Sequence, residues 1–222
     1  MNEILSKIKK ICTLDVNITS SSTPVSVQKL NIDFQTKLQD SLLNIDNEYT
    51  AAITYLKYMN THIMNIIPNI NVTFLDKIQL LQAWYNNIKN KDDDTNNADI
   101  AKVEIGINQE STFKISDLEL TVSYNIPSIK RENEFLDYIL QLPSHSAIDI
   151  VFFDNFRFIQ NIKFSDGAEC DFNTSTIGEI HQIFLLFDTP ILKNITSSIE
   201  ETLSSISSLR QLEGDFSFYT SM

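Results

Sequence analysis

The chain of 222 residues is 42% hydrophobic, which is enough to build a large core, and it has only 4 Gly and 5 Pro. Its formal charge of −12 repels nucleic-acid backbones and anionic membranes, so we expect neither as a partner. No apolar run approaches the roughly 20 residues that cross a bilayer, and the N-terminus has no signal-peptide core. These features predict a soluble, acidic protein that stays in the cytoplasm where it is made.

Helical spacing of apolar residues dominates the first ninety positions. A short first helix is predicted where Ile4, Ile8 and Ile11 recur beside three lysines, and a turn that includes Pro24 follows it. A helix with an apolar stripe of this kind must dock on something.

Three longer helices are expected next. The first runs over residues 27–45 and the second over residues 49–66, where Pro68 stops it. The short polar loop between them predicts antiparallel packing. The third helix begins where Thr73 can cap it, with Asp76 in its first turn.

The most polar stretch of the chain, residues 89–99, predicts an exposed loop and a boundary. Beyond it, apolar and polar residues alternate at 103–107 and again at 118–124. This alternation predicts two half-buried strands. Residues 132–142 have the length and spacing of a short helix.

The last third of the chain is predicted to complete a sheet and then return to helices. The apolar run at residues 148–164 predicts a β-hairpin with its turn near Asp154, and Gly167 marks the next turn. Thr176 begins one helix through a capping box, and Pro190 begins another.

These elements predict an α+β fold with N-terminal antiparallel helices, a central antiparallel β-meander of about four strands, and C-terminal helices. The expected regions are a helical region at 1–90, a β region with a short helix at 91–172, and C-terminal helices with an aromatic tail at 173–222. All three could form one compact domain, and the pattern leaves open whether there is one core or two.

The residues that usually carry chemistry form no assembled site in the sequence. His62, His145 and His181 fall in separate elements without a second ligand at helical spacing. The oxygen ligands between Asp92 and Asn97 resemble a calcium loop but lack its glycine and final glutamate. Four glycines are too scattered for a phosphate-binding loop. We therefore predict no catalytic residue, no metal and no cofactor.

Two further groups have ordinary structural explanations. Cys12 and Cys170 lie too far apart to form a spaced metal motif, and buried free thiols are the prediction. Asp166, Glu169 and Asp171 gather around a predicted turn, where burial that would separate their pKa values is rare.

Aromatic and apolar residues remain as candidates for protein binding. The cluster of Tyr55, Tyr58, Trp84 and Tyr85 is predicted to complete the core, because aromatic side chains bury well. The termini are the better candidates, since short amphipathic end segments have few neighbours within the chain. The predicted partner-binding residues are Ile4, Ile8, Ile11, Phe216, Phe218 and Tyr219.

Four segments carry a resemblance to a known family. They are the polar-faced helix at residues 27–42, Phe74-Leu75-Asp76-Lys77-Ile78-Gln79-Leu80-Leu81, Val122-Ser123-Tyr124-Asn125-Ile126-Pro127, and Leu212-Glu213-Gly214-Asp215-Phe216. In this order they resemble the baseplate hub assembly proteins of T-even-type contractile-tailed bacteriophages. The family usually has an arginine in the helix that here contains Trp84, and it often has a Pro-Gly opening that this chain lacks.

The resemblance implies a non-enzymatic assembly factor or minor structural subunit of the tail baseplate hub. Its partners would be other hub proteins, in the host cytoplasm during assembly, with retention in the virion tail and homo-oligomer formation left open. No functional residue is transferred, because the shared segments are architectural positions. The alternatives are an enzyme with a site around His145, Asp149 and Asp154, and a bacterial adaptor or inhibitor protein.

Overall fold

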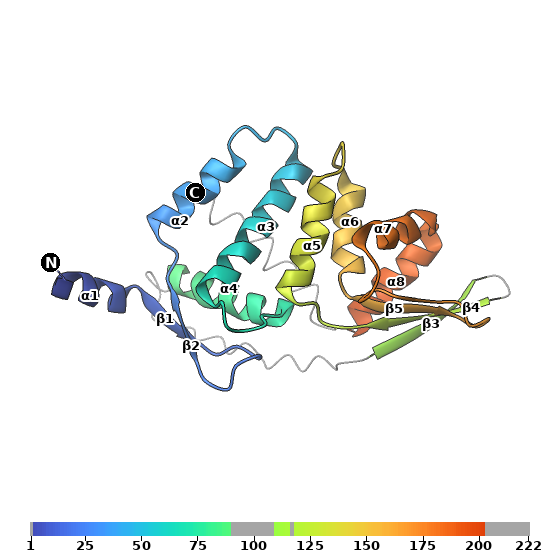
Figure 1. Ribbon diagram of the computed structural model, residues 1–222, viewed down its shortest axis with the longest axis horizontal. Helices are drawn as coiled ribbons and strands as arrows, with labels where there is room; N and C mark the ends of the chain where they lie inside the picture. The colour runs from blue at the N-terminus through green and yellow to red at the C-terminus, as the bar shows by residue number, and fades with distance from the viewer. Residues whose placement is uncertain (1, 90–108, 116–117, 203–222) are drawn as a thin grey trace.

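The computed structural model of the protein describes residues 2–89, 109–115 and 118–202 (Figure 1). Its helices are α1 (Asn2–Ile11), α2 (Ile32–Leu42), α3 (Glu48–Ile66), α4 (Phe74–Lys89), α5 (Ile129–Leu140), α6 (Ala147–Phe156), α7 (Ile177–Leu186) and α8 (Thr189–Thr202). Its strands are β1 (Thr13–Val16), β2 (Val25–Gln28), β3 (Gln109–Ile115), β4 (Leu118–Tyr124), β5 (Ile159–Phe164) and β6 (Glu169–Asp171). The predicted α+β class is confirmed.

The strands form two antiparallel sheets. β1 and β2 make a two-stranded hairpin, and the larger sheet has the order β3-β4-β5-β6. Figure 1 shows α6, α7 and α8 stacked on one side of the larger sheet, with α3 and α5 side by side next to them. The hairpin lies beside α4, at the end of the molecule from which α1 projects.

One continuous hydrophobic core runs through both halves of the described chain, from Val16 near the N-terminus to Ile199 in α8. The larger sheet contributes its inner face, on which Leu120, Val122 and Tyr124 are buried. Residues between them in β4 point to the other face, as the two-residue period of a strand requires. Pattern alone left one core or two open, and the packing forms one.

Charged side chains join the two halves inside this core. Glu132 of α5 accepts hydrogen bonds from Lys77 of α4 and from Arg157, the residue that follows α6. The three side chains are at most 1% exposed. The guanidinium of Arg157 packs over the rings of Phe74, Phe153 and Phe158. Its Cζ atom lies 4.3–5.0 Å from the three ring centroids.

The predicted second helix begins later than expected, because Val25–Gln28 forms β2 and not helix. Val27 pairs with Leu14 in the hairpin, and its side chain is 1% exposed in the core. Its spacing from Leu30 happens to match a helical turn. The helix starts at Ile32, where the Asn31 side chain accepts a hydrogen bond from the backbone N–H of Phe34. The hairpin itself was not predicted.

The predicted hairpin at residues 148–164 is wrong in its first half, which is helix α6. The Asp149 carboxylate accepts hydrogen bonds from the backbone N–H and the hydroxyl of Ser146, which starts the helix. Phe152, Phe153 and Phe156 are fully buried, and the exposed residues include Ile148 and Val151, so this helix shows no polar face in the sequence. A short apolar run of this kind does not distinguish a buried helix from a buried strand.

Other predicted elements are confirmed. The strand at 118–124 is β4, Gly167 turns β5 into β6 with a φ of 95°, and Thr176 caps α7 in a capping box with Glu179. α8 begins beside Pro190 as expected. β3 was not predicted. The strand expected at 103–107 lies outside the described residues, as do the loop expected at 89–99, apart from Lys89, and the chain beyond Thr202.

Candidate protein-interaction surface

α1 carries the apolar stripe that the sequence predicted, and no other described element covers it. Every side chain from Ile4 to Cys12 is exposed, and Ile4, Leu5, Ile8 and Ile11 expose 60, 49, 50 and 71% of their surface. Figure 1 shows the helix projecting from one end of the molecule. An isolated helix of ten residues is only marginally stable in water, so this one is suited to being covered by another surface.

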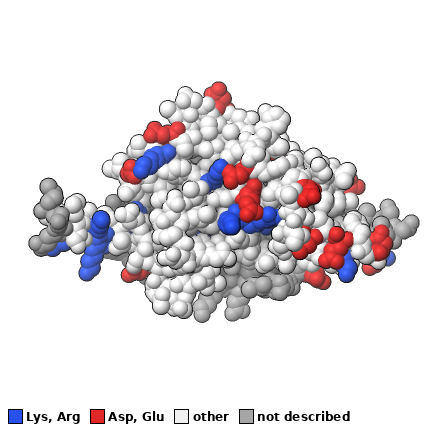
Figure 2. All heavy atoms as spheres, in the orientation of Figure 1, with Lys and Arg blue, Asp and Glu red and all other residues white. Residues whose placement is uncertain are grey.

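Lysines border the stripe on both sides. At 100° per residue, Lys7 lies beyond one edge of the stripe and Lys9 beyond the other, while Lys10 lies on the opposite face. The blue side chains on α1 stand apart from the acidic side chains over the far end of the larger sheet (Figure 2). A surface that covers the stripe would therefore be apolar along its centre and acidic along its margins.

The segment that joins α1 to the body is short. The helix ends at Ile11, where the N–H of Cys12 bonds to the carbonyl of Ile8, and the carbonyl of Cys12 accepts from the N–H of Lys29 in the hairpin. Cys12 is a free, exposed thiol, so its predicted burial is wrong. Cys170, also free, is half-buried beside Ser175.

The second predicted binding segment, Phe216, Phe218 and Tyr219, lies outside the described residues, as does the acidic run that resembles a calcium loop. Of the predicted binding residues, the structure therefore describes Ile4, Ile8 and Ile11, and it brings them together on one helix face. The predicted core role of the aromatic cluster is confirmed, because Tyr55 and Trp84 are buried and Tyr58 and Tyr85 pack against the core.

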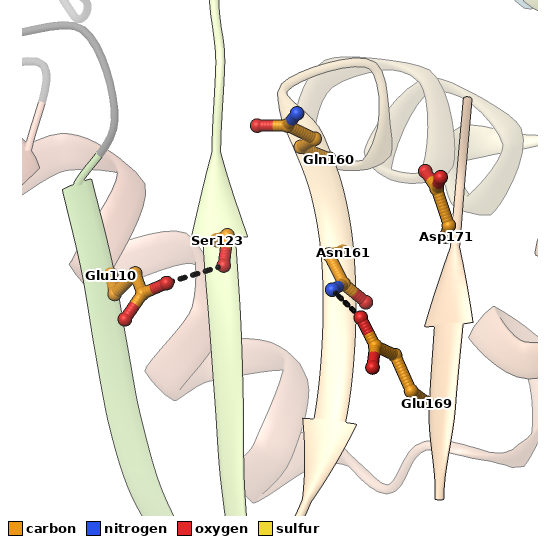
Figure 3. A pocket seen from close by; sticks show the side chains of 6 residues that line it. All are labelled: Glu110, Ser123, Gln160, Asn161, Glu169 and Asp171. Atoms are coloured by element: carbon orange, nitrogen blue, oxygen red, sulfur yellow. Dashed lines mark hydrogen bonds between the residues drawn. The ribbon is translucent and has the colours of Figure 1, made fainter.

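A shallow polar hollow of about 270 Å³ lies on the outer face of the larger sheet (Figure 3). Its lining residues are Glu110, Ser123, Gln160, Asn161, Glu169 and Asp171. The strand registers set four of these in a single row across the sheet, from Glu110 through Ser123 and Asn161 to Asp171. Successive side chains of a strand point to opposite faces, so these four paired residues, one from each strand, lie on the same face of the sheet.

The side chains of the hollow are largely bound to one another or to nearby turns. The Ser123 hydroxyl donates to Glu110 at 3.1 Å, and the Asn161 amide donates to Glu169 at 2.5 Å. Asp171 accepts from the backbone N–H of Asn173. The six lining residues include no His, Cys, Lys or Arg, and Ser123, the one hydroxyl among them, is paired with the exposed carboxylate of Glu110.

The residues of the enzyme alternative, His145, Asp149 and Asp154, each have a structural partner. Nε2 of His145 lies 2.9 Å from the carbonyl oxygen of Ile139, which can only accept, so Nε2 is the protonated nitrogen. Nδ1 then accepts from the hydroxyl of Thr50 at 2.7 Å. The two hydrogen bonds of His145 therefore link α3 to the end of α5. Asp149 caps α6, and the Asp154 carboxylate lies 3.6 Å from the guanidinium of Arg157.

The other two histidines pack among aromatic rings. His62 lies 4.5 Å from the ring of Phe34 and 6.0 Å from that of Trp84, and burial lowers its pKa below the usual 6.5. Nδ1 of His181 shares a hydrogen bond with the Tyr138 hydroxyl. Burial also lowers the pKa of His181. The half-buried ring of His62 is explained by the approach of α2 to α3.

Within the described ranges, no three His, Cys, Asp or Glu side chains are arranged to hold a metal ion. Among the helices that the structure describes, none is long and apolar enough to span a bilayer. No family model, no curated protein and no solved structure matches the chain. The surface of α1 is the feature of the described chain that is best suited to a function.

Proposed function

We propose that the protein is a non-enzymatic assembly factor or minor structural subunit of a contractile-tail baseplate hub, and that it acts by binding other proteins of the hub. The observation that carries the proposal is the uncovered stripe of α1. Four large aliphatic side chains, each about half exposed or more, lie on one helix face. Apolar patches of this kind on folded proteins mark binding surfaces.

Charge favours a protein partner over a membrane. The stripe is short, and the chain as a whole carries a charge of −12, which an anionic bilayer repels. An amphipathic helix that enters an apolar groove binds through anchors three and four residues apart, and Ile4, Ile8 and Ile11 have this spacing. Lys7 and Lys9 would meet acidic residues along the two margins of such a groove.

The baseplate setting comes from the family resemblance. Two of the four segments that carry it, the start of α4 and the end of β4 with its Pro127, lie next to each other: the backbone N–H of Phe74 donates to the carbonyl of Pro127 at 2.9 Å. A protein that assembles other proteins combines a stable body with an exposed surface that a partner covers. The single core and the projecting α1 suit these two roles.

The experiment is affinity capture of the tagged full-length chain from cells infected by a contractile-tailed phage, with mass spectrometry of what co-purifies. The variant Ile4→Asp with Ile8→Asp removes the apolar stripe, and Leu186→Asp is the matched control, since Leu186 is 84% exposed at the end of α7. We expect wild type and the control to recover tail hub proteins and the α1 variant to lose them. Recovery of no hub protein by the wild type would contradict the baseplate proposal.

A second outcome distinguishes the role of the α1 stripe from the role in the baseplate. If hub proteins co-purify equally with wild type and the α1 variant, the baseplate role stands and α1 is not the docking element. Circular dichroism of both variants checks that the fold is retained.

A further inference from the structure

β3 is an edge strand of the larger sheet. The strand order places β4 on one side of it, and no other described strand pairs with its outer edge. It is seven residues long, Gln109–Ile115, and Figure 1 shows it at the border of the sheet. An edge strand of this length presents a row of backbone N–H and C=O groups that can pair with a further strand.

The sequence of β3 is complementary to itself when it runs antiparallel. Its two charged residues, Glu110 and Lys114, lie two positions on either side of Thr112. If two copies pair with Thr112 opposite Thr112, each Glu110 faces the Lys114 of the other copy. Oppositely charged residues directly across a strand pair stabilise it.

Only this register brings the charges together. A two-fold axis normal to the sheet pairs residues that lie on the same face. The axis must therefore lie midway between one residue of the strand and the same residue of the second copy. Pairing about Glu110 or about Lys114 sets like charges opposite each other, and pairing about Ser111 or Phe113 sets one of the charges opposite Thr112. The arrangement about Thr112 is the one that the charges favour.

We propose that β3 binds β3 of a second copy of this chain, antiparallel and in register about Thr112, so that the two four-stranded sheets become one continuous sheet. The charges of the outer face extend the argument. Lys114 already lies opposite Glu119 of β4, so in the dimer it stands between Glu119 and the second copy's Glu110. The inference is independent of α1 and of the proposed baseplate role.

The inner face is compatible with such a dimer. Phe113 and Ser111 of β3 point to the side covered by α8, where Ser111 contacts Ser198. In the proposed register each half-buried Phe113 lies opposite the second copy's Ser111, which is small enough to leave room for the ring. The two-fold axis keeps the α8 helices of both copies on the same side of the sheet.

Sedimentation equilibrium of the full-length chain over a range of concentrations tests the proposal. We expect a species of twice the 25.4 kDa chain mass. Glu110→Lys alone and Lys114→Glu alone each place like charges opposite each other twice, and each should raise the dissociation constant at least about tenfold. The double variant restores opposite charges and should restore the dimer. Lys163→Glu, on the outer face of the central strand β5, is the control and should leave it unchanged.

Disulfide trapping tests the register. In a Cys12→Ser, Cys170→Ser background, Thr112→Cys places two thiols opposite each other on the axis, within disulfide range. Glu110→Cys places them about 13 Å apart along the strand, which is too far to bridge. We expect a covalent dimer on oxidation of the first variant and none of the second.

A chain that stays monomeric at every concentration overturns the proposal. So does a dimer that the single charge variants leave intact, or one that the double variant fails to restore. A dimer that survives Lys114→Glu but is lost in Ile8→Asp would place self-association at α1.

Discussion

Glu132 and Lys77 meet in the core 2.5 Å apart, although 55 positions separate them in the chain. The second carboxylate oxygen of Glu132 lies 2.7 Å from the guanidinium of Arg157, and the Asn60 amide also donates to this carboxylate. The Glu132 carboxylate of α5 therefore links this helix to α3, to α4 and to the end of α6. Such a centre requires all its partners, because a buried charge without a counter-charge is strongly destabilising.

Glu132→Gln is expected to lower the free energy of unfolding by about 3–5 kcal/mol, since it removes the buried charge that Lys77 and Arg157 share. Urea denaturation followed by circular dichroism measures the change. Glu134→Gln is the control in the same helix, because Glu134 pairs with Arg131 at a partly exposed site, and it should cost less than about 1 kcal/mol. Equal losses in the two variants would contradict a special role for the buried carboxylate.

Asp76→Ala is expected to destabilise the protein by about 2–4 kcal/mol, because hydrogen bonds to a buried carboxylate are strong. Asp76 is 0% exposed and accepts from the backbone N–H and hydroxyl groups of both Thr73 and Ser20. It therefore starts α4 and also holds the loop between β1 and β2. Asp15→Ala, at an exposed strand residue that bonds Ser26, should change unfolding by less than about 1 kcal/mol.

Acidification is expected to destabilise the protein as the pH falls through about 6.5, the ordinary pKa of histidine. Burial lowers the pKa of His62 in the folded state, so below this pH the unfolded chain binds more protons than the folded chain. Stability must then rise with pH through this window and level off above it. His181 adds to the effect in the same direction.

The variant His62→Phe isolates the contribution of His62. It keeps an aromatic ring between Phe34 and Trp84 and removes the titrating group, so the slope of unfolding free energy between pH 5.5 and 7.5 should fall. Urea unfolding at several pH values measures it. A slope identical to that of the wild type would show that His62 titrates alike in the folded and unfolded chain.

Ile8→Asp is expected to change the free energy of unfolding by no more than about 0.5 kcal/mol, because Ile8 is half exposed on α1 and does not belong to the hydrophobic core. The matched core variant Ile53→Ala removes a fully buried side chain of α3 and should cost about 2–5 kcal/mol. Thermal unfolding of the two variants distinguishes them. A large loss in Ile8→Asp would mean that the stripe of α1 contributes to the core of the free protein.

Local signals predicted the elements that depend on a few neighbouring residues. The Thr176–Glu179 capping box, the Thr73 cap, the stop at Pro68 and the turn at Gly167 act over three or four positions, and each lies where the sequence indicated. The amphipathic pattern of α1 is equally local. The predicted α+β class is confirmed, and the expected number of about four antiparallel strands matches the larger sheet, although β3 was not among the predicted strands.

Elements whose environment is made by distant residues were missed. α6 exposes the apolar residues Ile148 and Val151, so its sequence shows no polar face. β2 is a strand because it pairs with β1. The row from Glu110 to Asp171 exists because three strand registers bring together residues up to 61 positions apart, and no local pattern encodes these registers.

The sequence by itself determined the acidic charge, the fold class and the apolar stripe of α1. The tertiary structure decided which of these groups water reaches. Lys77, Glu132 and Arg157 resemble surface residues in the sequence, yet they are enclosed, while Ile8 and Ile11 resemble core residues and are exposed. Burial depends on which surfaces pack together, and that is set by the whole chain and not by the neighbours of one residue.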